Sequence, residues 1–333
     1  MKISIILVNY KTPQLTIDCL NSIYQYDSKD IEIIIVDNFS QDNTEQIVNE
    51  KFPSVKFIQM GYNAGFARAN NAGIRLSESE VVLLLNTDTI ILNDAINNCL
   101  NDFLKSDYIA CGVQLLNEDG SPQISGNYAM KGGLNYLLPL PYYGVFLKSI
   151  ADLFKIKKPN LPEAFGTIEV DWINGAFLMV KKSAIKNAGL LDEDFFLYAE
   201  EAEWCSRLKK QGKLCIYGYH KVLHLQGLSA NEAFLSTGKG YFNLSDKKGL
   251  QIMLSNFVRI RKEFGVLWLI FIFVNYLIGI PVFITGLIIE KLFKGKKATY
   301  QFRHWIGYCK NIFKVLNLLP NIIGNKPYFY KSL

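Results

Sequence analysis

The chain has 333 residues, of which 50% are hydrophobic and 20% are charged, and this balance excludes an intrinsically disordered protein. The length is sufficient for a catalytic domain of roughly 200–250 residues and an additional region. The net charge of +6 is unevenly distributed. Residues 239–333 contain fifteen Lys and Arg against three acids, a local net of +12, which leaves −6 for residues 1–238. An acidic body with a basic, apolar tail excludes nucleic acid as the main partner and favours a membrane surface.

The N-terminal sequence and the cysteines indicate a mature fold in a reducing compartment. The apolar run in MKISIILVNYKTP is too short for a signal peptide, so we interpret it as a strand. The six cysteines are scattered, with neither a CxxC pair nor the spacing of a zinc site. This distribution is typical of the reduced, mostly buried thiols of a cytosolic protein.

Strand and helix signals alternate through residues 1–115. Apolar, β-branched runs predict five strands, and amphipathic or Ala-rich segments between them predict four helices. The predicted strands are residues 3–8, 31–36, 55–60, 81–85 and 109–116, and the helices are expected to begin at Pro13, at Ser40 or Asp42, at Ala64 and at Asn93. Continuous apolar strands alternating with helices indicate a parallel sheet that is covered on both faces.

Polar side chains follow three of these strands. Asn9, Asp37 and Asp88 each stand at the carboxyl end of a predicted strand, which is the edge of an open α/β sheet where ligands bind. Asp88 follows five aliphatic residues in VVLLLNTDT, and a buried carboxylate is costly unless a partner meets it. We therefore expect the three side chains to line one site, with capping of the following turns as the alternative for Asp37 and Asp88.

The second part of the chain gives weaker signals. Residues 117–167 contain many Gly, Pro and Tyr residues and no strong period, which predicts an irregular insertion or a mobile loop over the site. The later predictions are strands within residues 168–180, a helix over residues 198–211, and two strands at residues 214–218 and 222–225.

One carboxylate stands on the wrong face of the helix expected at residues 198–211. At 100° per residue, four apolar side chains form one stripe: Leu197, Trp204, Cys205 and Leu208. Glu201 falls in the middle of this stripe and Glu200 at its edge, whereas Glu203 falls on the opposite side, where it can pair with Arg207. Desolvation raises the pKa of a carboxylate and makes it a better general base. We therefore expect Glu201 to be a base, with a structural ion pair as the alternative.

His224 is one of only three histidines and follows a strand-like segment. Imidazole and carboxylate groups often bind a divalent cation together, so His224 is a candidate partner for Asp88. The alternative is a hydrogen-bonded histidine of the core.

Taken in order, seven segments resemble the large inverting glycosyltransferase family 2, which has the GT-A fold. They are most similar to its bacterial rhamnosyltransferase-like members, which act in cell-surface polysaccharide synthesis. The segments are ISIILVNYK, IIIVDNFSQDNT, NAGFARANNAG, LLLNTDT, VDWINGAFLMVKKSAI, GLLDEDFFLYAEEAEWCSRLKKQG and HLQG.

The resemblance implies an α/β fold class and a division of the chain. The expected fold is a GT-A, Rossmann-like mixed sheet of the nucleotide-diphospho-sugar transferase type, flanked by helices, with a C-terminal helical hydrophobic extension. Residues 1–230 would form the catalytic domain, with a nucleotide-binding half at 1–115 and an acceptor half at 116–230. Residues 231–333 would form a helical, basic, membrane-associating region.

The resemblance also implies roles for individual residues. Six would line the nucleotide site: Asn9, Asp37, Asn63, Arg68, Asn86 and Thr87. Among them, Asp37 would face the pyrimidine base and Arg68 would lie near the diphosphate. Asp88 matches the second acid of the family's DxD metal motif and His224 an additional ligand, so Mg²⁺ or Mn²⁺ is the implied cofactor. Asn86 stands where the first acid often stands, a departure that argues against its direct contact with the metal.

Glu201 matches the family's catalytic base, which is usually Asp, so that here the side chain is one methylene longer. Five residues match segments beside the sugar and the acceptor: Asp171, Trp172, Gly175, Ala176 and Glu200. The implied reaction moves a sugar, with rhamnose among the candidates, from a UDP- or dTDP-sugar to a hydroxyl of a glycan or lipid-linked acceptor. The anomeric configuration would be inverted.

The tail contains 26 residues without a charge, 264–289, which exceeds the roughly 20 needed to cross a bilayer. Basic residues flank it on both sides, which is unusual for a simple span, and Gly279-Ile280-Pro281 predicts a bend. Five residues then repeat at helical spacing in a basic segment: Trp305, Cys309, Ile312, Phe313 and Leu316. We expect attachment to the cytoplasmic side of the cell membrane, as a peripheral, re-entrant or single-span segment. The alternatives are a helical hairpin packed on the catalytic domain and the interface of a homodimer.

Other function classes fit less well. A nicotinamide-dependent oxidoreductase or a nucleotidyltransferase needs a glycine-rich loop after the first strand, where this chain has NYKTPQ. A polymer-extruding synthase needs many spans, and only one long apolar segment is present. A catalytically weak or dead GT-A scaffold at the membrane stays open as the alternative, because Asn86 replaces the first metal acid.

Overall fold

The structure is a computed structural model of the whole chain, and it describes all residues except 1, 27–28, 129–133, 157–159, 226–242 and 333. The chain divides into two compact units. Unit 1 comprises Met1–Ala129, Pro159–Glu193 and Glu200–Ala233, and unit 2 comprises Met130–Lys158, Asp194–Ala199 and Phe234–Leu333. The predicted domain boundary at residue 230 lies outside the described residues.

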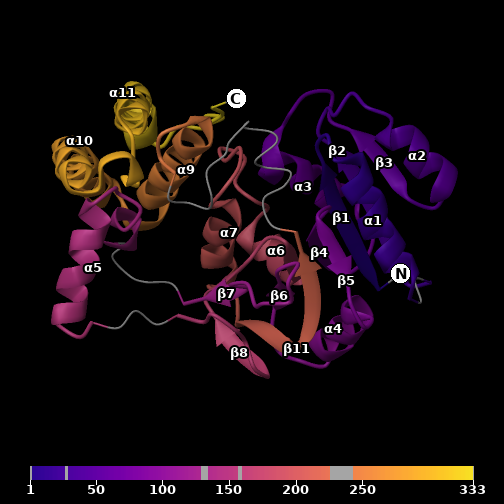
Figure 1. Cartoon of the computed structure of the whole chain (residues 1–333). Helices are drawn as coiled ribbons and strands as arrows, with labels where there is room; N and C mark the ends of the chain where they lie inside the picture. The colour runs from indigo at the N-terminus through magenta and orange to yellow at the C-terminus, as the bar shows by residue number, and fades with distance from the viewer. Residues whose placement is uncertain (1, 27–28, 129–133, 157–159, 226–242, 333) are drawn as a thin grey trace. The chain divides into compact units, whose positions relative to one another are not determined.

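Unit 1 is built on a mixed sheet with the strand order β3-β2-β1-β4-β10-β6-β11-β5, and β8 pairs with β11 (Figure 1). The strands are β1 (Ile3–Asn9), β2 (Ile31–Asp37), β3 (Lys56–Gln59), β4 (Val81–Asn86), β5 (Thr89–Ile91), β6 (Ala110–Leu116), β8 (Thr167–Val170), β10 (Phe177–Lys181) and β11 (Leu214–His224). The strands β1 to β4 are parallel, whereas β10 runs antiparallel to both β4 and β6. A second, two-stranded sheet joins β7 (Gly126–Asn127) to β9 (Trp172–Ile173).

Helices cover both faces of this sheet, as predicted. They are α1 (Pro13–Tyr24), α2 (Thr44–Lys51), α3 (Gly65–Leu76), α4 (Ala95–Leu104), α6 (Lys182–Ala188) and α7 (Glu200–Leu208). Side chains alternate between the two faces of β1, so that Ile5 joins a buried cluster with α1 and α4 while Ile6 joins a second cluster with α3, α6 and α7. Close packing of α3 on β1 requires Gly73, where a Cβ would lie 2.5 Å from a methyl carbon of Ile6.

Several boundaries differ from the prediction. The strands expected at residues 214–218 and 222–225 form the single strand β11, whose register with β6 shifts between Tyr217 and Lys221. The helix expected from residue 198 begins only at Glu200. The strand β5 and the helix α6 were not predicted, because each is too short to show a clear period.

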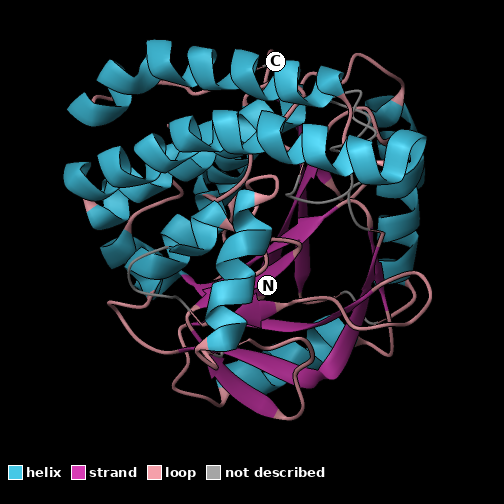
Figure 2. Ribbon diagram, turned by 60° about the vertical axis from the view of Figure 1, so that its left-hand side comes forward, coloured by secondary structure: helices cyan, strands magenta, loops and turns pink. Residues whose placement is uncertain are grey.

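Unit 2 is helical. It contains α5 (Tyr143–Leu153), α9 (Lys247–Phe264), α10 (Val266–Lys294) and α11 (Phe302–Gly324), with short 3₁₀ turns η1 (Leu134–Leu137) and η3 (Gly295–Lys297). The helices α9, α10 and α11, labelled in Figure 1 and cyan in Figure 2, pack against one another. Their core includes Phe257, Tyr276, Phe283 and Tyr308.

Two predictions for this unit are wrong. The expected loop at 117–167 contains α5, which the sequence concealed because Pro139, Pro141 and Gly144 stand at its start. The expected bend of the chain into a hairpin at residues 279–281 is absent, since α10 is one continuous helix. A Cβ at Gly279 would lie 2.7 Å from the hydroxyl oxygen of Tyr308, so this glycine permits close packing with α11.

Candidate functional site

The carboxyl ends of β1 and β2 hold a buried cluster of polar side chains. The Asn9 amide donates to Asp37 Oδ2 at 2.8 Å, and its oxygen accepts hydrogen bonds from Thr12 Oγ1 and Thr16 Oγ1 at 3.0 and 2.9 Å. The backbone N–H of Ser40 donates to Asp37 Oδ1 at 2.8 Å. Both carboxylate oxygens of Asp37 therefore accept a hydrogen bond from the protein itself.

Asp88 lies beyond the carboxyl end of β4 in a different environment. It is 2% exposed, and its Oδ1 accepts no hydrogen bond from the described residues. Instead, Oδ1 lies 3.4 Å from Nε2 of His224. The antiparallel pairing of β5 with β11 places His224 opposite Thr89, the neighbour of Asp88, and so brings together two residues that are far apart in the sequence.

Gln123 determines which ring nitrogen of His224 faces Asp88. The amide nitrogen of Gln123 donates to the backbone oxygen of His224 at 2.6 Å and to Asn117 Oδ1 at 2.8 Å, so its oxygen faces His224 Nδ1 at 2.9 Å. An amide oxygen only accepts, which assigns the ring hydrogen to Nδ1. In the neutral ring, the lone pair of Nε2 then faces both Asp88 Oδ1 at 3.4 Å and the side-chain amide nitrogen of Asn86 at 3.5 Å. The Asn86 amide can donate to Nε2, whereas a cation would be held by Nε2 and Asp88 Oδ1 together.

These residues fit a divalent cation. A buried carboxylate oxygen without a hydrogen bond lies beside an imidazole nitrogen, and the remaining ring nitrogen is held by Gln123, the arrangement that orients histidine ligands in metal sites. Within the described residues, no group of three His, Cys, Asp or Glu side chains is placed to hold a metal. Asp88 and His224 would therefore supply two ligands, and phosphate oxygens and water the others, as is usual for Mg²⁺.

Glu201 in α7 lies at the same edge of the sheet. Its Cβ and Cγ are 3.5 Å from the position that a Cβ on Gly175 would occupy. The next residue, Ala176, accepts a hydrogen bond through its carbonyl from Asn86 N at 3.1 Å, at the end of β4. The loop Gly175–Ala176 thus links Glu201 to the strand end that carries Asp88, and both carboxylates belong to unit 1.

The surroundings of α7 differ in part from the helical-wheel prediction. Trp204, one member of the predicted stripe, is fully buried, and Glu203 forms the expected ion pair with Arg207 at 2.7 Å. Glu203 is nevertheless buried, and Glu201 is only half-buried. Glu203 is buried because α6 packs against α7, where Arg207 also donates to the carbonyl of Ala188.

Three further predicted residues of the nucleotide site lie at strand ends and at the start of α3. Asn63 accepts a hydrogen bond from Gly65 N at 3.2 Å, and Arg68 donates to the Glu193 carbonyl at 3.0 Å. Thr87 is buried, with its hydroxyl 3.4 Å from that of Thr12.

The other predicted acceptor residues lie in α7 or beside it. Asp171 forms an ion pair with Lys209, just beyond the end of α7. Trp172 pairs with Asn127 in the small sheet, whose strand β9 contacts α7. Glu200, at the first position of α7, is 3% exposed.

Gln123 was not among the site residues predicted from the sequence. This residue stands in the segment expected to be irregular, and its contact with His224 spans 101 positions of the chain. The residues around Gln123 and those around His224 gave no indication that an amide would face the ring. Only the preference of metal-binding histidines for a second hydrogen-bond partner pointed to such a residue.

Comparison with known proteins identifies the fold and the relatives of this chain. Residues 4–167 match the family model described as Glycosyl transferase family 2. A low-salt glycan biosynthesis hexosyltransferase of Haloferax volcanii is 29% identical over 63% of this chain and 62% of its own length. A poly-beta-1,6-N-acetyl-D-glucosamine synthase of Staphylococcus epidermidis is 29% identical over 61% of this chain and 45% of its own.

A third relative, N-acetylglucosaminyl-diphospho-decaprenol L-rhamnosyltransferase of Mycobacterium tuberculosis, is 26% identical over 56% of this chain and 64% of its own. The chain thus spans between 45% and 64% of the length of these relatives. A crystal structure of GalNAc-T7 with UDP, GalNAc and Mn²⁺ is similar in fold, with a TM-score of 0.50 and 14% identity over 74% of this chain and 50% of that chain.

Proposed function

Because this chain is a member of glycosyl transferase family 2 with a GT-A fold, we propose that it is a metal-dependent, inverting glycosyltransferase with its active site at the carboxyl ends of β1, β2 and β4. The donor would be a UDP- or dTDP-sugar, and the acceptor a hydroxyl of a glycan or of a lipid-linked sugar. One observation carries the proposal: Glu201 lies against Gly175, and the next residue, Ala176, is hydrogen-bonded to Asn86, two residues before the Asp88 that faces His224.

Each residue has a distinct part in the proposed reaction. Glu201 accepts the proton of the acceptor hydroxyl as that oxygen attacks the anomeric carbon from the face opposite the diphosphate. Asp88 and His224 would hold Mg²⁺ or Mn²⁺, which neutralises the negative charge that grows on the departing nucleoside diphosphate. A single displacement inverts the anomeric carbon, so the site needs no second carboxylate as a nucleophile.

The donor would lie along the strand ends of β1, β2 and β4. Asn9 and Asp37 would border the base, while Asn63, Arg68 and Thr87 would border the ribose and the diphosphate. Rhamnose is a candidate sugar because one relative is named as a rhamnosyltransferase. The half-buried Glu201 would then meet the acceptor together with Glu200 of the same helix and with Asp171 and Trp172, which lie beside α7.

Glu201→Gln tests the base directly. The variant keeps the size of the side chain but cannot take a proton, so transfer is expected to fall by about 10²–10⁴-fold while donor binding is retained. Glu118→Gln is the matched control, because Glu118 is an exposed acid of the same unit. Near-normal turnover of Glu201→Gln would contradict the assignment.

A scaffold without activity is the alternative, and donor hydrolysis separates the two. The purified chain is incubated with UDP-, dTDP- and GDP-sugars, with Mn²⁺ or with a chelator, and release of nucleoside diphosphate is measured. We expect release from one donor class, dependent on the metal. Release from no donor, in the presence of a range of hydroxyl acceptors, would support the scaffold.

We further propose that unit 2 attaches the enzyme to the cytoplasmic surface of the cell membrane. Among the described residues, α10 alone is long and apolar enough to cross a bilayer, but 39% of its apolar window is already buried in the protein. Two helices of unit 2 carry highly exposed apolar side chains: Leu153, the last residue of α5, is 77% exposed, and Leu292 and Phe293 in α10 are 79% and 86% exposed. Exposed apolar side chains on two helices of a folded unit favour an interfacial position over an isolated span.

Sedimentation with anionic lipid vesicles tests this attachment. The double variant Leu292→Asp, Phe293→Asp is expected to lose binding, because two charges would have to enter the apolar layer of the membrane. Leu76→Asp, an exposed leucine at the end of α3 in unit 1, is the control. If the wild-type chain ignores vesicles and instead doubles its mass in solution, the apolar surface is a homodimer interface.

A further inference from the structure

The chain passes briefly through unit 2 just before the proposed base. Asp194–Ala199 belongs to unit 2, whereas Glu193 on one side and Glu200 on the other belong to unit 1. Only one residue separates this segment from Glu201. Contacts that order Asp194–Ala199 therefore restrict the backbone that leads directly into α7.

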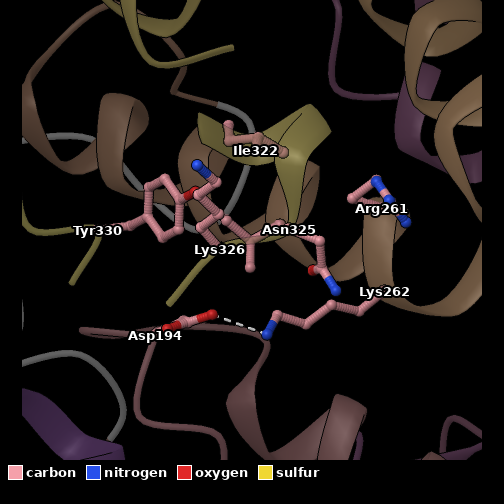
Figure 3. Close-up of a pocket in the computed structure, with 8 residues that line it drawn as sticks. Asp194, Arg261, Lys262, Ile322, Asn325, Lys326 and Tyr330 are labelled. Atoms are coloured by element: carbon pink, nitrogen blue, oxygen red, sulfur yellow. Dashed lines mark hydrogen bonds and ion pairs between the residues drawn. The ribbon is translucent and has the colours of Figure 1, made fainter. Parts of the chain in front are cut away.

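Asp194 is held by α9 and by the last residues of the chain. Its Oδ2 forms an ion pair with Lys262 Nζ at 2.7 Å, and its Oδ1 accepts a hydrogen bond from Tyr328 N at 2.9 Å. Its carbonyl accepts from Tyr330 N at 3.0 Å. Figure 3 shows Asp194 and Lys262 facing each other below Tyr330. The side chains of Asp194 and Lys262 are 13% and 19% exposed, so water screens this pair only partly.

The rest of the segment is held in the same way. The ring of Phe196 lies 5.7 Å from that of Phe329, and Ser255 in α9 donates to the Leu197 carbonyl at 2.7 Å. The C-terminal residues are themselves fixed to α9, because the buried Gln251 donates to the Tyr330 carbonyl and accepts from Ser332 N, both at 2.9 Å.

The segment ends in a backbone conformation that needs such support. Tyr198 and Ala199 have φ values of 73° and 69°, a region that residues with a Cβ adopt only at an energetic cost. Two such residues in succession persist only where surrounding contacts impose them. On the far side of the segment, Glu193 is anchored within unit 1 by Arg75 at 2.7 Å and Asn71 at 3.1 Å.

We propose that α9 and the C-terminal residues 328–332 position Glu201 through the segment Asp194–Ala199, with the Asp194–Lys262 ion pair as the principal contact. Lys262 is thus a positioning residue, which acts on the base through the backbone. The inference rests on the proposed role of Glu201 as the base. The helical unit would then be needed for the rate of transfer, in addition to any part in membrane attachment.

Lys262→Met tests the proposal because it removes the charge and keeps most of the side chain's length. With detergent-solubilised full-length protein, we expect kcat for transfer to fall roughly tenfold while the donor KM changes by less than about twofold, since a small displacement of a catalytic group slows the reaction and the donor residues lie in unit 1. Lys262→Arg should restore most of kcat. Lys294→Met, which removes another ion pair of unit 2, with Glu290, is the matched control and should leave kcat unchanged.

Two further variants separate positioning from a general loss of stability. The double variant Asp194→Asn, Lys262→Met should have a kcat no lower than that of the slower single variant, because both changes remove the same contact. Ala199→Gly accepts the positive φ without strain, so its melting temperature should not fall, yet kcat should decrease because the segment gains freedom.

The outcomes distinguish a failure of the positioning role from a failure of the proposed function. Unchanged kcat in Lys262→Met, or a fall in kcat that is matched by a lower melting temperature and not restored by Arg, would overturn the positioning role while leaving the proposed function intact. Full activity of Glu201→Gln would instead overturn the proposed function itself.

Discussion

Two carboxylates at the same edge of the sheet, Asp37 after β2 and Asp88 after β4, are equally buried, at 1% and 2% exposed. Asp37 receives a hydrogen bond on each oxygen, from Asn9 and from Ser40. Oδ1 of Asp88 receives none within the described part of the chain and faces a ring nitrogen of His224. Burial and position at a strand end are thus shared, and only the hydrogen-bond partners distinguish the two residues.

The difference has an energetic meaning. A buried carboxylate whose two oxygens are both hydrogen-bonded contributes to stability, whereas a buried carboxylate oxygen that meets no donor costs free energy that the rest of the fold must offset. Such a cost is retained where the group has another task, and cation binding is the task that suits Asp88 beside His224. Asp37 therefore has a structural part whether or not it also contacts a nucleotide, and Asp88 has none that these contacts reveal.

Asp88→Asn should give the largest effect on sugar transfer. A variant with normal transfer would contradict the distinction between Asp88 and Asp37. We expect transfer to fall by at least about 10²-fold, because the charge that holds the cation is lost. In a chelator, the free energy of unfolding should stay the same or rise by about 1 kcal/mol, because an uncompensated buried charge has been removed. Metal-dependent release of nucleoside diphosphate and urea unfolding measure the two quantities.

Asp37→Asn should act in the opposite sense on stability. The new amide nitrogen meets a donor, from either Asn9 or Ser40, so the free energy of unfolding should fall by about 1–3 kcal/mol. Urea unfolding of the two Asn variants side by side is the measurement. Equal destabilisation by Asp37→Asn and Asp88→Asn would mean that the two carboxylates have the same structural role.

Gln123→Met tests whether the orientation of His224 matters for metal binding beside Asp88. The variant keeps the length of the side chain but cannot accept from Nδ1, so the ring loses its fixed orientation and metal affinity should fall by about 10–100-fold. Calorimetric titration of Mn²⁺ in the presence of nucleoside diphosphate measures this affinity. Gln14→Met, a change at an exposed glutamine of α1, is the control and should leave it unchanged. Unaltered metal affinity in Gln123→Met would mean that the hydrogen bond between Gln123 and His224 Nδ1 does not determine how the ring binds the metal.

The sequence predicted the first half of unit 1 well for a physical reason. Runs such as Ile3–Asn9 and Val81–Asn86 are apolar at nearly every position, because each strand is buried on both faces, and such runs leave little ambiguity. The strand-end residues Asn9, Asp37 and Asp88 follow directly from these boundaries. Their placement at one edge of one sheet is therefore a local property of the chain.

The remainder depended on contacts between distant segments. Nothing near Gln123 in the sequence indicates His224, and nothing near Glu203 indicates that α6 will cover it. The helix α5 and the continuation of α10 through Pro281 likewise follow from packing within unit 2. Tertiary contacts override local propensity at these places, as is common for short or uniformly apolar segments.

Glu32, on the same strand as Asp37, should show the smallest effect. It tests the rule that a buried carboxylate stabilises the fold when hydrogen-bond donors surround it. Burial by itself would raise the pKa of Glu32, but the backbone N–H of Glu78, the Lys56 ammonium and the Ser4 hydroxyl all donate to it and together hold its pKa below the ordinary value of 4.5. A carboxyl with a lowered folded pKa contributes stability at pH values above that ordinary value, and this contribution is lost as the pH falls through the folded pKa.

Glu32→Gln should therefore lower the free energy of unfolding by about 1 kcal/mol at pH 7, and the difference from wild type should shrink below pH 4.5. Urea unfolding between pH 7 and about pH 3 measures it, and a difference that stays constant over this range would mean that shape, and not the charge of Glu32, is what its donors recognise.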